Sequence, residues 1–178
     1  RHYPDMYWDT DRQELRGELA FRMIYDSDDE SHYIINPNAS TCTGQGILIE
    51  DVYKVDIVFR DVQFLPEVCE IGGRIKATQK KWGIDNLVDL HVYSKGDCCL
   101  CILPELDQKL PNGFNLEDFF HRLLVPYFYY QSYYEQFGQA PWRGYSHNAA
   151  GYLESYLYRQ KTSPDLVKKY MLFLPTTK

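Results

Sequence analysis

The sequence has no run of about 20 consecutive apolar residues, which excludes a membrane-spanning helix. It has no cationic excess either, because 19 Lys and Arg residues are set against 25 Asp and Glu residues, giving a formal net charge of -6 at pH 7. Such a chain lacks the broad basic face that non-specific binding to nucleic acid or to anionic membranes requires. Internal repeats and low-complexity tracts are also missing, which excludes repeat architectures.

The residues that are present describe an ordinary folded domain. Of the 178 residues, 44% are hydrophobic and 25% are charged, which is typical of one globular domain with a sizeable core. This balance argues against disorder over most of the chain. Tyrosine occurs 16 times. Because its ring packs at one end and forms hydrogen bonds at the other, this content favours a binding surface as well as a core.

The five cysteines are poorly arranged for disulfides. Their number is odd, and Cys98, Cys99 and Cys101 crowd into one short segment, where neighbouring cysteines rarely meet the geometry of a bridge. We therefore expect these three, together with Cys42 and Cys69, to be free thiols, as in a reducing compartment. The first residues contain no apolar signal-peptide segment. The expected location is the cytoplasm.

The hydrophobic pattern predicts strands in the first half of the chain. Thr10 begins a short helical pattern, with Gln13 as its capping-box partner. Four strands are then expected over residues 19–25, 32–35, 47–60 and 68–75, joined by short turns as an antiparallel meander. The range 47–60 has the clearest alternation of apolar and polar side chains. Residues 77–88 are expected to form a connector.

The second half reads as helices. Asn115 is the predicted N-cap of a helix whose apolar residues recur at helical spacing up to Leu124. Pro126 is expected to kink or end this helix, and the pattern resumes up to Phe137. Further helices are predicted over 149–158 and from Ser163 onward. Strands followed by helices predict one α+β domain over residues 1–178: an N-terminal helix, a four-stranded antiparallel meander, then helices.

Residues 89–103 hold the most informative side chains. His91 and Lys95 lie close in sequence to three cysteines, Cys98, Cys99 and Cys101. A cysteine becomes a working nucleophile when its thiolate is accessible and is favoured by positive charge or backbone dipoles. Acyl transfer also needs a donor for the developing oxyanion, which a nearby His can supply. Alternatively, the cysteines are small hydrophobic residues of a core strand. A zinc site is a third interpretation, against which the missing Cys-x-x-Cys spacing argues.

Residues 89–103 read Asp-Leu-His-Val-Tyr-Ser-Lys-Gly-Asp-Cys-Cys-Leu-Cys-Ile-Leu. This segment resembles the active-site segment of ubiquitin-conjugating enzymes, which carry His-Pro-Asn, a short turn and then Gly-x-x-Cys-Leu-x-Ile-Leu. Aligning Cys99 with the family's catalytic cysteine places Gly96 on the motif glycine and His91 on the asparagine, without a gap. The chain departs from the family at the triplet, where Asp-Leu-His replaces His-Pro-Asn. The order of the expected helix, strands and later helices is similar to that fold.

The second half narrows the resemblance. The Tyr-rich segment 127–135, the segment Pro-Trp-Arg-Gly-Tyr-Ser-His over 141–147 and Gly-Tyr-Leu-Glu over 151–154 resemble prokaryotic ubiquitin-conjugating-enzyme-like proteins of anti-phage cyclic-oligonucleotide signalling (CBASS) operons. In those systems the conjugating enzyme, alone or fused to an activating enzyme, acts on the C-terminus of a cGAS-like nucleotidyltransferase. Because the chain has no room for an activating domain, the resemblance implies the free-standing type.

The resemblance implies acyl transfer through a thioester, with Cys99 and His91 as catalytic residues. Cys99 would attack the C-terminal carbonyl of the partner, and a lysine amine would then take the acyl group to form an isopeptide bond. No metal or organic cofactor is expected. The energy would come from a separate activating enzyme or from cleavage of a longer partner tail. The alternative is a non-catalytic interaction module of the same fold, which the missing His-Pro-Asn triplet favours.

Several roles at this site stay open. Cys101 competes with Cys99 for the role of nucleophile, because a loop shifted by two residues would exchange them. His91 is either an oxyanion donor or base, or a hydrogen-bond donor that braces the loop. Asp89 is either the acceptor of the lysine proton or a solvated acid. His147, between a loop and a helix, either caps or packs that helix or takes part in catalysis.

Overall fold

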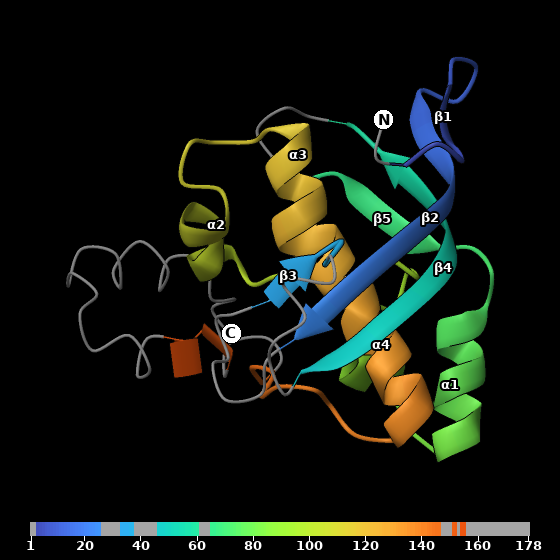
Figure 1. The fold of residues 1–178 in the computed structure, drawn as a ribbon, viewed down its shortest axis with the longest axis vertical. Helices are drawn as coiled ribbons and strands as arrows, with labels where there is room; N and C mark the ends of the chain where they lie inside the picture. The colour runs from blue at the N-terminus through green and yellow to red at the C-terminus, as the bar shows by residue number, and fades with distance from the viewer. Residues whose placement is uncertain are drawn as a thin grey trace, which may run out of the picture.

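The computed structural model describes residues 3–25, 33–37, 46–60, 65–146, 151–152 and 154–155. In the described residues all strands come first and all helices follow, and α1 and a short 3-10 helix lie between the last strand and the cysteine segment (Figure 1). The elements, in chain order, are β1 (Met6–Asp9), β2 (Glu14–Tyr25), β3 (Tyr33–Ile35), β4 (Ile47–Val58), β5 (Glu67–Glu70), α1 (Arg74–Trp82), η1 (Leu87–Leu90), α2 (Leu103–Lys109), α3 (Leu116–Phe119), η2 (Phe120–Leu124) and α4 (Val125–Phe137).

The sheet is antiparallel and has five strands, with β2 near its centre (Figure 1). β4 pairs with β2 along its whole length, from Val58 opposite Glu14 to Ile47 opposite Tyr25. β5 continues the sheet beyond β4, while β1 and β3 pair with the other edge of β2. The α+β class is confirmed, but the expected meander order is wrong. β3 has only 3 residues and cannot satisfy the backbone of the 12-residue β4, which therefore pairs with β2.

Alternation along β4 places one face of the sheet in the core. Tyr53, Val55 and Ile57 are at most 1% exposed, whereas Lys54 between them is exposed. The alternation predicted for 47–60 is confirmed. The long helix made of α3, η2 and α4 crosses this buried face (Figure 1). The rings of Tyr53 and Phe128 meet there with their centroids 4.6 Å apart.

The predicted start of the long helix is confirmed. The Asn115 side chain accepts a hydrogen bond from the backbone N–H of Asp118, as an N-cap does. Of the two outcomes expected at Pro126, the helix does not end there, and α4 continues to Phe137, where the resumed helical pattern was expected to stop. A π-helical turn, η2, comes immediately before it. Proline lacks the N–H that an α-helix would use at this position, and the wider turn accommodates that loss.

Two further expectations for the first half are wrong. The N-terminal helix expected from Thr10 is a turn between β1 and β2. The Asp9 carboxylate accepts the backbone N–H groups of Asp11 and Arg12, and Gln13 adopts a left-handed φ of 57°, which turns the chain back into β2. The expected connector 77–88 is instead largely helical, because α1 runs from Arg74 to Trp82 and η1 follows.

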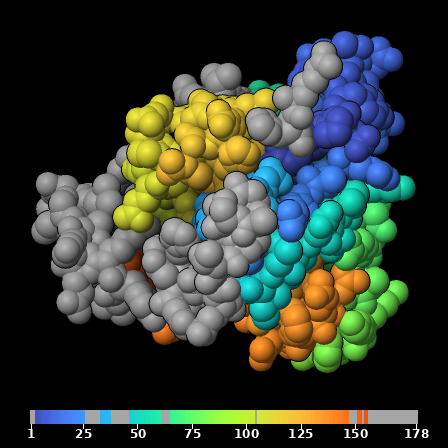
Figure 2. Space-filling view, in the orientation of Figure 1, coloured from blue at the N-terminus to red at the C-terminus, as the bar shows by residue number. Residues whose placement is uncertain are grey.

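A polar network fastens α1 to the sheet and to α4. Arg74, the first residue of α1, donates two hydrogen bonds to the Asp51 carboxylate of β4, at 2.7 and 2.8 Å. The Arg74 guanidinium also pairs with Glu135 of α4 and lies 4.3 Å from the centre of the Tyr53 ring. Ser132 of α4 donates to the same aspartate. α1 and the end of α4 consequently lie side by side on the surface (Figure 2).

The remaining expectations concern segments near the ends and the thiols. In the predicted helix 149–158, the four residues that the structure describes are helical, namely Gly151, Tyr152, Glu154 and Ser155. The helix expected from Ser163 lies outside the described residues, as does Cys42. The other four cysteines are free thiols. Within the described ranges, no helix is both long enough and apolar enough to cross a membrane.

Candidate active site

The cysteine segment is a tight hairpin that runs from His91 to Cys99. The Cys99 N–H donates to the His91 carbonyl at 2.7 Å, and the Tyr93 N–H donates to the Asp97 carbonyl at 2.8 Å. Gly96 closes the turn, with its N–H on the Tyr93 carbonyl and a φ of 99° that side chains rarely allow. The hairpin therefore places the side chains of Tyr93 and Cys99 on paired segments of the same loop.

The second arm of the hairpin extends the sheet. The Cys98 N–H donates to the Val68 carbonyl of β5 at 2.7 Å, and Asp97 pairs with Cys69. The Cys69 thiol donates to the Asp97 carboxylate at 3.3 Å. Burial, followed by the Asp97 carboxylate, raises the pKa of Cys69 to about 11. Cys69 is therefore a neutral hydrogen-bond donor that anchors the loop to the sheet.

α4 holds the first arm of the hairpin from the opposite side. Tyr127 donates its hydroxyl to the His91 carbonyl at 3.2 Å, and Gln131 donates its side-chain amide to the Leu90 carbonyl at 2.7 Å. These two side chains lie one helical turn apart on α4. His91 has a left-handed φ of 56°, so a non-glycine residue occupies a costly backbone conformation here. The two hydrogen bonds from α4 help to maintain it.

Tyr93 is the side chain that meets the candidate nucleophile. Its hydroxyl donates a hydrogen bond to the Cys99 sulfur, with 3.1 Å between Oη and Sγ. The Tyr93 ring is 53% exposed, while Cys99 is half-buried. The contact therefore lies at the surface on its tyrosine side, while the cysteine is partly covered.

Two effects shift the pKa of Cys99 in opposite directions. Burial raises the pKa of the Cys99 thiol, and the hydrogen bond from Tyr93 works in the opposite direction. Burial and the hydrogen bond to Cys99 raise the pKa of Tyr93. Tyr93 therefore stays protonated at neutral pH and remains a donor. Because the thiolate accepts this hydrogen bond more strongly than the thiol does, Tyr93 favours the nucleophilic form of Cys99.

The neighbouring cysteines differ from Cys99. Cys98 is 8% exposed and packs in the hydrophobic core, and burial raises its pKa to about 12. Cys98 thus fits the interpretation of a small core hydrophobe. Cys101 is half-buried, and burial followed by the Glu105 charge raises its pKa to about 12. Among the three clustered cysteines, hydrogen-bonding to Tyr93 distinguishes Cys99, which favours Cys99 as the nucleophile.

His91 packs against the helical side of the site. Its ring meets the Tyr130 ring edge to face, with the centroids 5.2 Å apart. A Cβ built on Gly144 would lie 3.1 Å from His91 Nε2, so the backbone at Gly144 passes close to the imidazole. These contacts, together with the two hydrogen bonds on the adjoining carbonyls, favour a bracing role for His91. The structure instead brings the Tyr93 hydroxyl to the sulfur.

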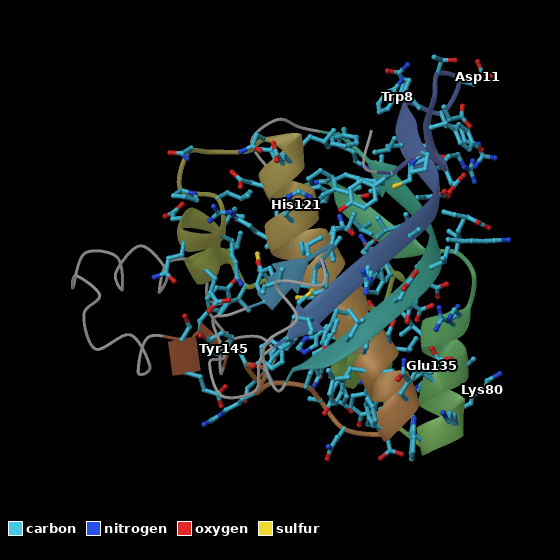
Figure 3. All side chains as sticks on the ribbon, viewed as in Figure 1. Trp8, Asp11, Lys80, His121, Glu135 and Tyr145 are labelled. Carbon is cyan, nitrogen blue, oxygen red and sulfur yellow. The ribbon has the colours of Figure 1, made fainter. Side chains whose placement is uncertain are left out.

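A second tyrosine comes from far along the chain. Burial, followed by the nearby sulfurs of Cys99 and Cys101, raises the pKa of Tyr152. Ser146 donates its N–H and its hydroxyl to the Glu154 carboxylate, both at 2.7 Å. These two hydrogen bonds tie the loop at Ser146 to the helical residues that contain Tyr152. Figure 3 shows Tyr145 beside the helical residues that include Tyr152. Of the other predicted residues, Asp89 is exposed next to His91, and His147 lies outside the described residues.

Sequence reasoning missed Tyr93, Tyr127 and Gln131. Tyr93 was part of the matched segment, but the family motif assigns no role to that position. The signal that could have found it is the hairpin itself, since Gly96 predicts a turn that folds Tyr93 back onto Cys99. Tyr127 and Gln131 could not be found, because their partners are backbone carbonyls that lie 36 and 41 residues earlier in the chain.

The described part of the chain contains no cluster of three His, Cys, Asp or Glu side chains that could hold a metal ion. Comparisons with known protein families, with curated proteins and with solved structures gave no match for this chain.

Proposed function

We propose that this protein is a ubiquitin-conjugating-type acyltransferase that carries its acyl group as a thioester on Cys99. The observation that supports this most directly is the hydrogen bond between the Tyr93 hydroxyl and the Cys99 sulfur at the surface. A half-buried thiol with a fixed donor, on a hairpin anchored by β5 and α4, is suited to nucleophilic catalysis. The resemblance of residues 89–103 to the conjugating-enzyme segment supports the same conclusion.

The reaction has two acyl-transfer steps. In the first, the Cys99 thiolate attacks the activated C-terminal carbonyl of the partner protein, the leaving group departs, and a thioester forms. In the second, a lysine amine attacks this thioester, loses a proton and forms an isopeptide bond, while the Cys99 thiolate is released. The Tyr93 hydroxyl, freed from the thiolate, can donate to the carbonyl oxygen as negative charge develops there.

We propose that the partner is a cGAS-like nucleotidyltransferase and that the protein acts in cytoplasmic anti-phage defence of the CBASS kind. The support is the resemblance of segments 127–135, 141–147 and 151–154 to the free-standing conjugating enzymes of those operons. The acyl group arrives from a separate activating enzyme or from cleavage of a longer partner tail. The fold proposed with this function is the ubiquitin-conjugating-enzyme-like fold. The structure departs from the expected form of that fold in three ways: a turn replaces the N-terminal helix, the sheet is not a simple meander, and helix α1 lies between the sheet and the cysteine loop.

The first experiment tests the nucleophile without the partner. The protein is incubated with a synthetic peptide that carries a C-terminal thioester, and the mass of the intact protein is measured with and without added thiol. We expect a thiol-labile adduct that Cys99→Ala abolishes and Cys101→Ala preserves. Cys99→Ser should give a slower and thiol-resistant ester, because an alkoxide is a poorer leaving group than a thiolate. An adduct that survives Cys99→Ala but not Cys101→Ala would move the nucleophile by two residues.

The second experiment tests the partner. The protein is mixed with a cGAS-like nucleotidyltransferase and an activating enzyme from one CBASS operon, and intact masses are measured. We expect a thiol-labile adduct between the protein and the nucleotidyltransferase, which Cys99→Ala removes. If neither experiment gives an adduct with the wild-type protein, the non-catalytic interaction module takes the place of the enzyme. The left-handed His91 at the position of the family's asparagine is the observation that favours that second candidate.

A further inference from the structure

A surface groove lies between α1 and the turn of the cysteine hairpin. It has a volume of about 330 Å³, at the lower end of the range of ligand pockets. Two sides of the groove come from segments that are distant in sequence: Lys76 and Gln79 from α1, and residues 92–96 from the hairpin. Residues 85–87 complete the lining. The groove is thus made by the packing of α1 against the loop that carries the nucleophile.

The charges in this groove are not balanced within the protein. Two lysines, Lys76 and Lys95, line it against one carboxylate, that of Asp85. Both lysines are exposed, and neither forms an ion pair with any residue in the described ranges. In a chain with a formal net charge of -6, two unpaired cations in one groove form a local site for an anionic group.

Tyr93 links the groove to the candidate nucleophile. Tyr93 lines the groove, and the hydroxyl of the same side chain reaches the Cys99 sulfur at 3.1 Å. A chain lying along the groove and over the Tyr93 ring would therefore bring its end to the thiol. The amide and hydroxyl side chains of Gln79, Asn86 and Ser94 offer hydrogen bonds to an extended backbone. A peptide fits this lining better than an apolar ligand does.

We infer that this groove binds an acidic, extended peptide segment, which lies against Lys76 and Lys95 and points its C-terminal end toward Cys99. The inference rests on the proposed function in one respect only, namely that the peptide is the tail of the acyl donor. Binding itself requires no chemistry at Cys99. The groove would thereby select donors whose tails carry Asp or Glu residues shortly before the reacting carbonyl.

The test is a binding measurement on a variant that cannot react. The anisotropy of a fluorescein-labelled peptide of alternating Glu and Gly residues is titrated with Cys99→Ala protein at low salt. The same background then carries Lys76→Glu and Lys95→Glu together. We expect this double reversal to weaken binding of the acidic peptide by about tenfold or more, because it removes two attractions and adds two repulsions. The reversed protein should instead bind a matched Lys-Gly peptide.

The matched control reverses two cations outside the groove, Lys54 and Arg12, which changes the net charge by the same amount. Lys54 lies on β4 beside Glu18, and Arg12 lies in the turn between β1 and β2, next to Asp11, which Figure 3 labels at the end of the molecule away from α1. We expect this control to weaken binding by less than threefold. Equal losses in the two double variants would overturn the inference, since the attraction would then be general. No binding by the unreversed protein, or no loss in Lys76→Glu/Lys95→Glu, would overturn it as well.

Binding and chemistry can fail separately. If the acidic peptide binds through the two lysines but no variant ever forms a thioester, the groove stands and the proposed acyl transfer does not. If the peptide thioester loads Cys99 equally well with acidic and with Gln-containing sequences, and anisotropy detects no binding, acyl transfer stands and the groove does not.

Discussion

Removal of the Tyr93 hydroxyl should raise the pKa of Cys99. Tyr93→Phe keeps the ring that packs beside the loop and deletes only the donor that lies 3.1 Å from the sulfur. The thiolate then loses a hydrogen bond that the neutral thiol uses far less. Because burial already raises the Cys99 pKa, the loss of the opposing contact should raise it further.

The size of the shift follows from the exposure of the pair. A hydrogen bond to a charged group contributes about 1.5–3 kcal/mol in a folded protein. Since Tyr93 is 53% exposed, water competes for the thiolate, and we halve that contribution to about 0.75–1.5 kcal/mol. One pKa unit corresponds to about 1.4 kcal/mol, so the pKa of Cys99 should rise by about 0.5–1 unit.

The assay is alkylation of Cys99 by iodoacetamide, followed over pH by mass spectrometry of the peptide that contains it. At neutral pH the thiolate fraction of Tyr93→Phe should fall about three- to tenfold, and the rate should fall about two- to fourfold, because the remaining thiolate is more basic and more nucleophilic. Above the pKa the variant should react about twofold faster than the wild type, because a more basic thiolate is a better nucleophile. Slower reaction below the pKa and faster reaction above it distinguish a pKa shift from lost access.

The control is Tyr7→Phe, which removes a hydroxyl from an exposed tyrosine on β1. It should leave the pH profile of Cys99 unchanged. Tyr93 does not stabilise the Cys99 thiolate if the pH profile of Tyr93→Phe equals that of the wild type, or if the pH midpoint of alkylation falls. A profile lowered equally at every pH would mean that Tyr93 controls access to the sulfur and not the stability of the thiolate.

Three further predictions concern the framework and the thiols. Gln131→Leu should lower the free energy of unfolding in urea by about 1–3 kcal/mol, because the buried Leu90 carbonyl loses its donor, whereas the exposed Gln136→Leu should have little effect. Burial raises the pKa of Asp51, but hydrogen bonds from Arg74 and other groups outweigh it, and the net shift is downward. The stability that this carboxylate contributes should thus be present above its unfolded pKa of about 3.9, and it should be lost as the pH falls through the lower pKa of the folded state. Asp51→Asn should flatten this acid transition. Thiol titration under non-reducing denaturation should find five free thiols, and fewer would contradict the expectation of a reducing compartment.

Local patterns in the sequence predicted the elements that depend on nearby residues. The alternation over 47–60 corresponds to β4, and the Asn115 cap begins the long helix where expected. The predictions failed where a local pattern has two outcomes. Thr10 to Gln13 has the composition of a helix start. Instead, the Asp9 carboxylate accepts hydrogen bonds from the N–H groups of Asp11 and Arg12, which closes a turn. α1 was missed because its apolar stripe is weak and its packing comes from contacts with β4 and α4.

Sequence patterns alone predicted the α+β class and the strand and helix starts that have clear local signals, and the resemblance of residues 89–103 pointed to Cys99 as a candidate nucleophile. The surroundings of that sulfur depend on how the chain folds. The hairpin turn brings the Tyr93 hydroxyl to Cys99, β5 buries Cys98, and α4 supplies Tyr127 and Gln131 to the loop carbonyls. The contacts from β5 and α4 join residues across long stretches of chain. A periodic pattern reports which face of an element is apolar, and it holds no information about which distant backbone atom that face will meet.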